Sequence, residues 1–242
     1  MILQNALVFI QLCHSLNDIM ELIHPFSMMV AGGRKAGKTE FTKSLLRSRE
    51  IVTNPFPERI VWCYAKHQEE LYEELMIINS NIEYLHGIPE NIETMFTKDE
   101  TNLIVLDDMM DEASKSDKVS QLFTRGRHDN LSVIFLTQNL FQKNQRSISL
   151  NSDYMVIFKN PRDKSQIQNL AKQFMSNNSK FLTWAYQDAT EKPHSYLLLD
   201  LTPDIDDRYR VRAKILPGEE PQIVYIPTNK QCLISLFYDI NE

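Results

Sequence analysis

The sequence predicts an α/β fold with a mainly parallel central sheet flanked by helices. Short apolar runs alternate with segments of helical periodicity along most of the 242-residue chain, which is the order that βαβ units produce. Several of these runs are almost continuously apolar, as expected for strands that are covered by helices on both faces. A chain of this length that is 43% hydrophobic can bury a sizeable core as one structural domain.

The predicted core elements follow one another from residue 26. Strands are expected at 26–32, 59–65, 102–108, 131–138 and 154–160, and helices at 39–50, 69–78, 113–124 and 163–174. No internal repeat and no Gly/Ser linker interrupts this order. We therefore predict a core over residues 25–180.

An extension is predicted on each side of this core. Apolar residues at helical spacing between Leu3 and Ile23 predict an N-terminal helical extension over 1–24. Three β-like runs from Ser195 onward are separated by prolines. They predict a small C-terminal β extension within 181–242, which packs on the core as a peripheral sheet.

Charge and cysteine content exclude several classes of protein. A net charge of −6 is incompatible with a uniformly basic nucleic-acid coat, although local basic patches can still bind a polyanion. The three cysteines are far apart and lack paired metal-ligand spacing, so neither a disulfide framework nor a zinc site is indicated. The apolar N-terminal residues lack a basic leader and a cleavage site, and no run is long enough to span a bilayer. We therefore expect an intracellular protein without a membrane partner.

The most specific motif is a complete phosphate-binding loop of the pattern G-x-x-x-x-G-K-[ST]. It lies directly after an apolar strand and directly before a helix, and its residues are Gly32, Gly33, Arg34, Lys35, Ala36, Gly37, Lys38 and Thr39. The glycines allow the backbone N–H groups to surround phosphate oxygens, and the helix adds its positive N-terminal end. Lys38 would reach the β- and γ-phosphates, and the Thr39 hydroxyl would bind Mg²⁺. The loop therefore predicts a site for ATP and Mg²⁺.

A Walker B pattern supplies the acidic partner that such a loop needs. The apolar run at 102–106 ends in Asp107 and Asp108. Asp107, at the strand tip, would hold Mg²⁺, directly or through water, and Asp108 would act as the general base on the attacking water. Most hydrolytic P-loop proteins of this type have glutamate at the position of Asp108, and aspartate is one methylene shorter. Asp111 or Glu112 could therefore reach the water instead.

A third strand, at 131–138, ends in Gln138, whose amide can donate and accept hydrogen bonds. If this strand lies beside the Walker B strand, Gln138 would be close to the attacking water and would act as a γ-phosphate sensor. Thr137 and Asn139 are the neighbouring alternatives.

Two arginines, Arg125 and Arg127, lie in a short turn before the sensor strand. An arginine supplied by a neighbouring subunit can stabilise the charge that develops on the γ-phosphate. Both residues are candidates for this role, and a pair of surface arginines would look the same in the sequence.

The order GGRKAGKT, LIVLDD, TRGRH and SVIFLTQ resembles the FtsK–HerA superfamily of DNA pumps, which are RecA-like additional-strand P-loop ATPases. Within it, the segments LIVLDDMMDEASKS, FTRGRHDNLSVIFLTQNLF and YMVIFKNPRDKSQIQNLA are similar to the genome-packaging ATPases of poxvirus-type viruses, virophages and Polinton-like elements. The likeness spans about residues 26–175. It implies the sensor role for Gln138 and the finger role for Arg127 or Arg125. The superfamily usually has glutamate where this sequence has Asp108.

The resemblance also implies a biological setting. It implies a homo-oligomeric ring, a pentamer or a hexamer, that drives double-stranded DNA into a preformed capsid by way of its portal or vertex proteins. The protein would then work at the virus assembly site, in the cytoplasm or nucleus of the host cell, with the virion as a further location.

The charge distribution agrees with a polyanionic partner. Between residues 143 and 180 there are two acids and seven bases, which are Lys143, Arg146, Lys159, Arg162, Lys164, Lys172 and Lys180. Residues 67–112 carry thirteen acids and one lysine. A basic segment can bind phosphates irrespective of base sequence, as a DNA motor requires, although solvated helix faces have a similar composition.

These observations favour an ATPase that couples hydrolysis to DNA translocation and viral genome packaging. A small-molecule kinase also uses a P-loop, but the Walker B pair followed by a sensor glutamine disfavours it. A nucleotide-gated interaction protein, in which ATP binding switches conformation, is the third interpretation.

Overall fold

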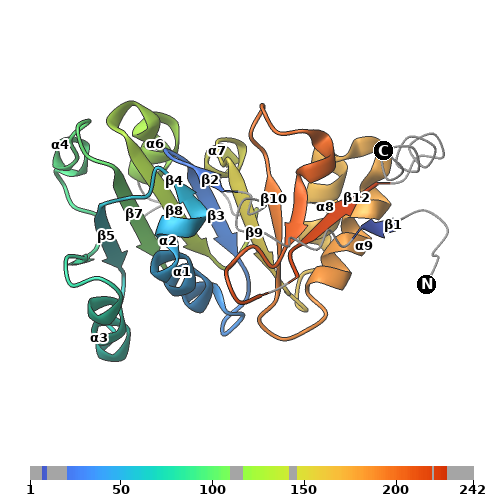
Figure 1. Ribbon diagram of the computed structural model, residues 1–242, viewed down its shortest axis with the longest axis horizontal. Helices are drawn as coiled ribbons and strands as arrows, with labels where there is room; N and C mark the ends of the chain where they lie inside the picture. The colour runs from blue at the N-terminus through green and yellow to red at the C-terminus, as the bar shows by residue number, and fades with distance from the viewer. Residues whose placement is uncertain (1–6, 10–20, 110–116, 142–145, 220, 228–242) are drawn as a thin grey trace, which may run out of the picture.

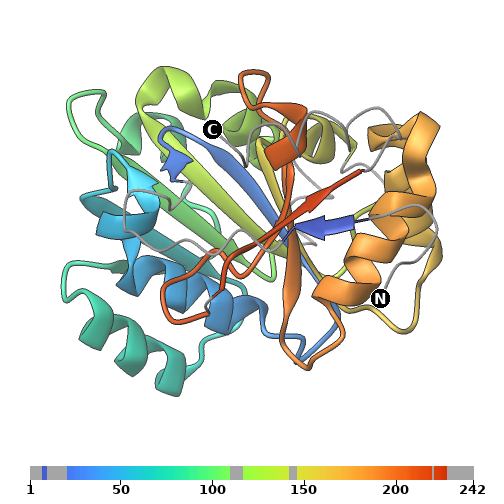
Figure 2. The same ribbon diagram turned by 45° about the vertical axis from the view of Figure 1, so that its right-hand side comes forward.

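The computed structural model describes residues 7–9, 21–109, 117–141, 146–219 and 221–227, and its central feature is a ten-stranded sheet between layers of helices (Figure 1, Figure 2). Six of the ten strands run parallel to one another: β3 (Ser27–Ala31), β5 (Arg59–Tyr64), β6 (Glu83–His86), β7 (Asn102–Asp107), β8 (Leu131–Thr137) and β9 (Tyr154–Phe158). In space, these strands follow the order β9-β3-β8-β7-β5-β6. The five predicted core strands are confirmed. β6 is an additional edge strand, whose mixed sequence EYLH carries no apolar run.

Helices cover both faces of the parallel strands. On one face lie α1 (Lys38–Arg47), α2 (Arg49–Val52) and α3 (Glu69–Ile78). On the other lie α4 (Ile92–Met95), α6 (Lys118–Arg125), α7 (Arg146–Leu150), α8 (Ser165–Phe174) and α9 (Ser179–Ala189). Alternate residues of each strand enter the two cores, as Met29 and Val30 of β3 do. Within the described ranges, no helix has the length and apolarity needed to cross a bilayer.

The predicted helices are present: α3 has the predicted bounds, and the ends of the others are shifted. Helix α6 is described from Lys118, and residues 113–116 of the predicted helix lie outside the described residues. A short 3-10 turn, η2 (Gly126–Asp129), follows α6 directly and leads into β8. Two further 3-10 turns are η3 (Ser176–Asn178) and η4 (Asp207–Tyr209).

The predicted C-terminal β extension is present, but its strands continue the central sheet instead of forming a small peripheral sheet. The strands β10 (Tyr196–Asp200), β11 (Val211–Ala213) and β12 (Ile223–Ile226) follow β9 in spatial order, each antiparallel to its neighbour. Every residue of β10 is buried, and a strand buried on both faces needs hydrogen-bonding partners along both edges. Pairing with β9 on one side and β11 on the other meets this requirement.

The N-terminal segment also differs from the prediction. Leu7–Phe9 forms β1, which pairs antiparallel with β12 at the edge of the sheet. Leu22–Ile23 forms β2, which pairs with β4 (Thr53–Asn54) in a separate two-stranded sheet. The helical prediction is therefore wrong at these residues, because a short apolar run cannot be assigned to helix or strand by periodicity alone. The rest of 1–20 lies outside the described residues, and the boundaries at 25 and 180 stay predictions.

Candidate nucleotide-binding site

The segment between β3 and α1 forms a tight loop over residues 32–39. Gly37 has a φ of 112° and is the N-cap of α1, while Lys35 has a φ of 61°. Both values lie in the left-handed region, which glycine adopts without steric cost. The Ala36 N–H donates to the Gly33 carbonyl at 3.2 Å and closes the turn. A curled backbone followed by a helix N-terminus is the arrangement that binds phosphate groups.

Gly32 anchors this loop to the sheet. Its N–H donates to the carbonyl of Thr137 at 3.1 Å. A Cβ at this position would lie 2.6 Å from the Cβ of Phe158 in β9, so only glycine fits without movement.

The segment before β10 also reaches the loop. The His194 Nδ1 lies 3.3 Å from the Ala36 carbonyl oxygen, and His194 also borders Gly37. Neither Phe158 nor His194 was predicted from the sequence as a residue of the site. Phe158 could have been noticed as the last apolar residue of its strand, but no local pattern marks His194.

The side chain of Lys38 folds over the loop. Its ammonium donates to the carbonyls of Gly32 and Gly33 at 2.8 and 3.1 Å. Burial lowers the pKa of Lys38, while the charges of Asp107 and Asp108 act in the opposite direction. The ammonium is therefore within electrostatic reach of both Walker B carboxylates.

The strand register explains why the P-loop and the Walker B acids meet. Ala31 of β3 pairs with Thr137 of β8, and Leu136 of β8 pairs with Asp107 of β7. These three strands therefore end at one edge of the sheet, with neighbouring strands about 4.8 Å apart. Because the chain enters the P-loop directly after Ala31, the loop begins two strands away from Asp107.

Asp107 and Thr39 offer the donor set that Mg²⁺ prefers, a carboxylate and a hydroxyl. Burial, and after it the neighbouring Asp108 carboxylate, raises the pKa of Asp107 from 3.8 to about 6, against the opposing effect of Lys38. A half-buried carboxylate whose ionised form is disfavoured by its surroundings suits a bound cation. Among the described residues, no group of three or more His, Cys, Asp or Glu side chains could hold a metal by itself. A cation here would therefore depend on phosphate oxygens for further ligands, as Mg²⁺ bound to ATP does.

Asp108 follows β7 in an unusual backbone conformation. Its φ is 57°, in the left-handed region, and its side chain is exposed. Aspartate tolerates this region better than most residues, and such conformations are concentrated at functional sites. The alternative bases, Asp111 and Glu112, lie outside the described residues.

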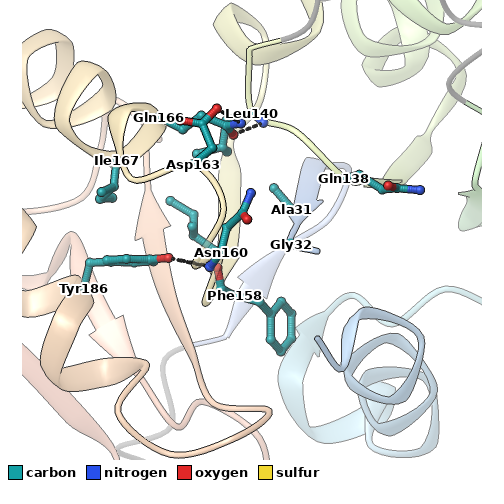
Figure 3. A pocket seen from close by; sticks show the side chains of 11 residues that line it. Ala31, Gly32, Gln138, Leu140, Phe158, Asn160, Asp163, Gln166, Ile167 and Tyr186 are labelled. Atoms are coloured by element: carbon teal, nitrogen blue, oxygen red, sulfur yellow. Dashed lines mark hydrogen bonds between the residues drawn. The ribbon is translucent and has the colours of Figure 1, made fainter. Parts of the chain in front are cut away.

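Gln138 lies at the same edge, one residue beyond β8. Figure 3 shows its side chain directed away from Asn160 and from β9, and it makes no hydrogen bond to a residue that the structure describes. The two alternative sensors are engaged locally. The Thr137 hydroxyl donates to the Asn139 carbonyl at 3.1 Å, and the Asn139 side chain accepts a bond from Gln166 at 3.2 Å.

The two arginines lie at the opposite ends of the strands from the P-loop, just before β8 begins. Both precede β8, and the seven residues of β8, at about 3.3 Å each, place them roughly 20 Å from Gln138. Arg127 forms an ion pair with the buried carboxylate of Asp153, whereas Arg125 is exposed and makes no ion pair with any described residue. Neither arginine can therefore reach the nucleotide site of its own chain.

Comparison with known proteins agrees with this arrangement. The family described as "Poxvirus A32 protein" matches residues 16–182, which is more than half of the chain and includes the P-loop, the Walker B acids, Gln138 and both arginines. The chain belongs to the Poxvirus A32 protein family. The resemblance to poxvirus-type packaging ATPases is thereby confirmed.

The A32-family relatives include the DNA packaging protein OPG160 of vaccinia virus (strain Copenhagen), of monkeypox virus and of variola virus. Each is 30% identical to this chain in an alignment of 128 positions that covers 47% of this chain. The match covers 46% of the vaccinia and variola proteins and 41% of the monkeypox protein. The chain thus spans about half the length of these relatives.

Solved structures show the same fold in this A32-family chain and in a packaging enzyme. The genome packaging NTPase B204 of Sulfolobus turreted icosahedral virus 2, in complex with ATP-gammaS, superimposes with a TM-score of 0.51. The alignment covers 73% of this chain and 93% of that chain, at 12% sequence identity. Its complex with sulfate gives a TM-score of 0.50 at 13% identity, over 73% and 91% of the two chains. The likeness confirms the predicted α/β P-loop NTPase fold.

Proposed function

We propose that this protein is an ATPase that couples ATP hydrolysis to the movement of double-stranded DNA during viral genome packaging. The observation that carries the proposal is the strand register, which brings the P-loop with Lys38 and the Walker B acids Asp107 and Asp108 to one edge of the sheet. Membership of a family whose relatives are named DNA packaging proteins supports the DNA substrate.

Each residue of the site has a role in this proposal. The backbone of the P-loop and the Lys38 ammonium bind the triphosphate of ATP. Thr39 and Asp107 would hold Mg²⁺, which neutralises charge on the phosphate oxygens when it is bound. Asp108 accepts a proton from the attacking water. Gln138, whose amide has no partner among the described residues, senses the γ-phosphate.

The arginine arrangement supports a ring of identical subunits. An arginine that lies about 20 Å from its own nucleotide site, by the length of β8, can act only on a neighbour's site. Asp153 engages Arg127, which leaves Arg125 as the arginine available to reach across a subunit interface. A head-to-tail interface of this kind closes into a ring when the rotation between subunits permits it. We propose a pentamer or a hexamer.

The remaining partners follow from packaging. The ring would engage portal or vertex proteins of the capsid and would work at the virus assembly site, in the cytoplasm or nucleus of the host cell. The basic residues between 143 and 180 would meet the DNA phosphates; Lys143 lies outside the described residues.

The test is steady-state ATPase activity measured with and without double-stranded DNA, with the oligomer size recorded in the same samples. We expect DNA to stimulate the assembled wild-type protein and Lys38→Ala to abolish turnover. Lys98→Ala removes an exposed lysine remote from the P-loop and should behave as wild type. Hydrolysis that DNA does not affect at any oligomer size would contradict translocation, and phosphate transfer to an added acceptor in place of phosphate release would indicate a kinase.

A further inference from the structure

A loop rich in exposed cations follows β9 at the nucleotide edge of the sheet. This basic loop, residues 159–164, carries Lys159, Arg162 and Lys164, all exposed and none in an ion pair with a described residue. Its single acid, Asp163, is engaged by the start of α8. The Asp163 Oδ1 accepts bonds from the backbone N–H and the hydroxyl of Ser165, at 3.1 and 2.5 Å. The basic loop therefore presents a net positive surface.

The basic loop lies beside the P-loop. Ile157 of β9 pairs with Ala31 of β3, so the two loops leave neighbouring strands at the same edge. Gly32 touches Phe158, the last residue of β9. A narrow pocket is lined by Gly32 of the P-loop, by Asn160 of the basic loop and by Gln138, which follows β8 (Figure 3). A polyanion bound to the basic loop would therefore lie close to the nucleotide.

One side chain joins the basic loop to the segment that follows the sensor. The Gln166 Oε1 accepts a hydrogen bond from the Leu140 N–H at 2.8 Å. Its Nε2 donates to Asp163 Oδ2 at 2.8 Å (Figure 3). It also donates to Asn139 Oδ1 at 3.2 Å. A single half-buried amide thus connects the residues next to Gln138 with the acid of the basic loop.

The other end of the basic loop is fixed separately. The Asn160 N–H donates to the Tyr186 hydroxyl of α9 at 2.9 Å, and this hydroxyl donates to the Phe158 carbonyl at 3.2 Å. The start of the loop is therefore held on β9 and α9, and its end is held by Gln166. A shift of the segment after β8 would reach the loop through Gln166, at the end of the loop.

We propose that the basic loop binds the phosphates of duplex DNA and that Gln166 is the positioning residue that couples this binding to the nucleotide state sensed by Gln138. The inference rests on the proposed function and adds the DNA-binding surface and the link to it. Phosphate contacts carry no base specificity, as a motor acting on any sequence requires. If nucleotide binding changes DNA affinity through Gln166, DNA must change nucleotide affinity by the same factor.

The binding surface is tested by fluorescence anisotropy with a labelled duplex over a salt series. Arg162→Gln combined with Lys164→Gln should weaken DNA binding and reduce the slope of log affinity against log salt by about 1.8, which is about 0.9 for each DNA phosphate that the variant no longer neutralises. The affinity for ATP, measured in the absence of DNA, should not change in this variant. Arg47→Gln combined with Lys98→Gln removes two exposed cations that lie outside residues 143–180 and serves as the matched control. Equal weakening in both double variants would overturn the assignment to the basic loop.

The coupling is tested by the ratio of DNA dissociation constants with and without a non-hydrolysable ATP analogue. In wild type this ratio should differ from one, and Gln166→Ala should bring it towards one. Gln168→Ala, an exposed glutamine of the same helix, should keep the wild-type ratio. Gln166→Glu keeps the acceptor for the Leu140 N–H but places a carboxylate beside the carboxylate of Asp163. It should therefore also lose the coupling. This variant replaces Gln166→Ala if the alanine variant folds poorly.

The outcomes separate this inference from the proposed function. A wild-type protein that binds no duplex DNA would overturn both. A wild-type ratio of one, or a ratio that Gln166→Ala and Gln166→Glu leave at the wild-type value, would overturn the coupling while DNA-stimulated hydrolysis still supported the proposed function. A purely structural role for Gln166 would lower thermal stability without changing the ratio.

Discussion

Arg127 forms an ion pair with Asp153, and the Asp153 carboxylate also accepts hydrogen bonds from the backbone N–H and the hydroxyl of Ser27. The carboxylate is buried, with 8% of its side chain exposed, whereas 56% of the Arg127 side chain is exposed. The pair joins the turn before β8 to the starts of β3 and β9, at the edge of the sheet opposite the P-loop. Arg127 therefore has a structural partner that Arg125 lacks among the described residues.

Arg127→Ala should lower the free energy of unfolding by about 1–3 kcal/mol, because it leaves a buried carboxylate with only its Ser27 hydrogen bonds. Arg125→Ala should change it by about 0.5 kcal/mol or less, as is usual for an exposed side chain. Urea unfolding of both variants measures the difference. Equal stabilities would show that the ion pair does not contribute to folding.

Arg125→Ala should lower ATP turnover of the assembled ring by about 1000-fold, the effect typical of removing an arginine finger. Binding of ATP should be retained, since Arg125 lies far from the nucleotide site of its own chain. Turnover is measured at protein concentrations above and below ring assembly. If dilute wild-type monomer and ring hydrolyse ATP equally fast, no arginine acts between subunits.

Gly32→Ala should destabilise the protein by about 1–3 kcal/mol, the usual range for an overpacked site, and should weaken ATP binding. The added Cβ would lie 2.6 Å from the Phe158 Cβ, so the P-loop would have to move off β9. Gly33→Ala is the matched control, because its Cβ would meet no atom within 4 Å and its φ is not in the left-handed region. Thermal unfolding of both variants measures the loss of stability, and ATP titration measures binding by Gly32→Ala; equal destabilisation by Gly33→Ala would rule out the Phe158 contact as the cause.

Asp107→Asn should stabilise the protein in the absence of Mg²⁺ and nucleotide. The folded protein holds the Asp107 proton up to about pH 6, whereas the unfolded chain releases it near 3.8. Ionisation of Asp107 therefore costs stability as the pH rises through this interval. The variant should exceed wild type by about 1–3 kcal/mol at about pH 7.5, and the difference should fall to roughly half at about pH 5. Urea unfolding with a chelator present measures it; a difference independent of pH would exclude titration of Asp107 as its origin.

Asp108→Asn should reduce turnover by about 100-fold or more, the range for removal of a general base, while ATP binding is retained. Asparagine adopts the left-handed region as readily as aspartate, so the φ of 57° should be preserved in the variant. Single-turnover kinetics and ATP binding separate the two effects, with Lys38→Ala as the variant expected to lose binding. Wild-type turnover would transfer the base role to Asp111 or Glu112.

The P-loop and the core strands could be predicted from the sequence because they depend on neighbouring residues. Phosphate is bound by consecutive backbone groups, so the spacing of Gly32, Gly37, Lys38 and Thr39 is itself the signal. A buried parallel strand is likewise marked by its own apolar run, as β7 and β8 are. Because parallel strands of such a sheet end at one edge, the proximity of Asp107 and Gln138 to the loop followed from the strand assignment.

Contacts between distant segments were decided only by the tertiary structure. The P-loop packs against Phe158 and His194, which follow it by more than a hundred residues. Asp153 forms an ion pair with Arg127, although the sequence around neither residue indicates the other as its partner. The C-terminal strands joined the central sheet because β9 offered a hydrogen-bonding edge, which is a property of the assembled sheet and not of their own sequence. Residue patterns along the chain encode what a segment can form, and the packing of the whole chain selects which partner it meets.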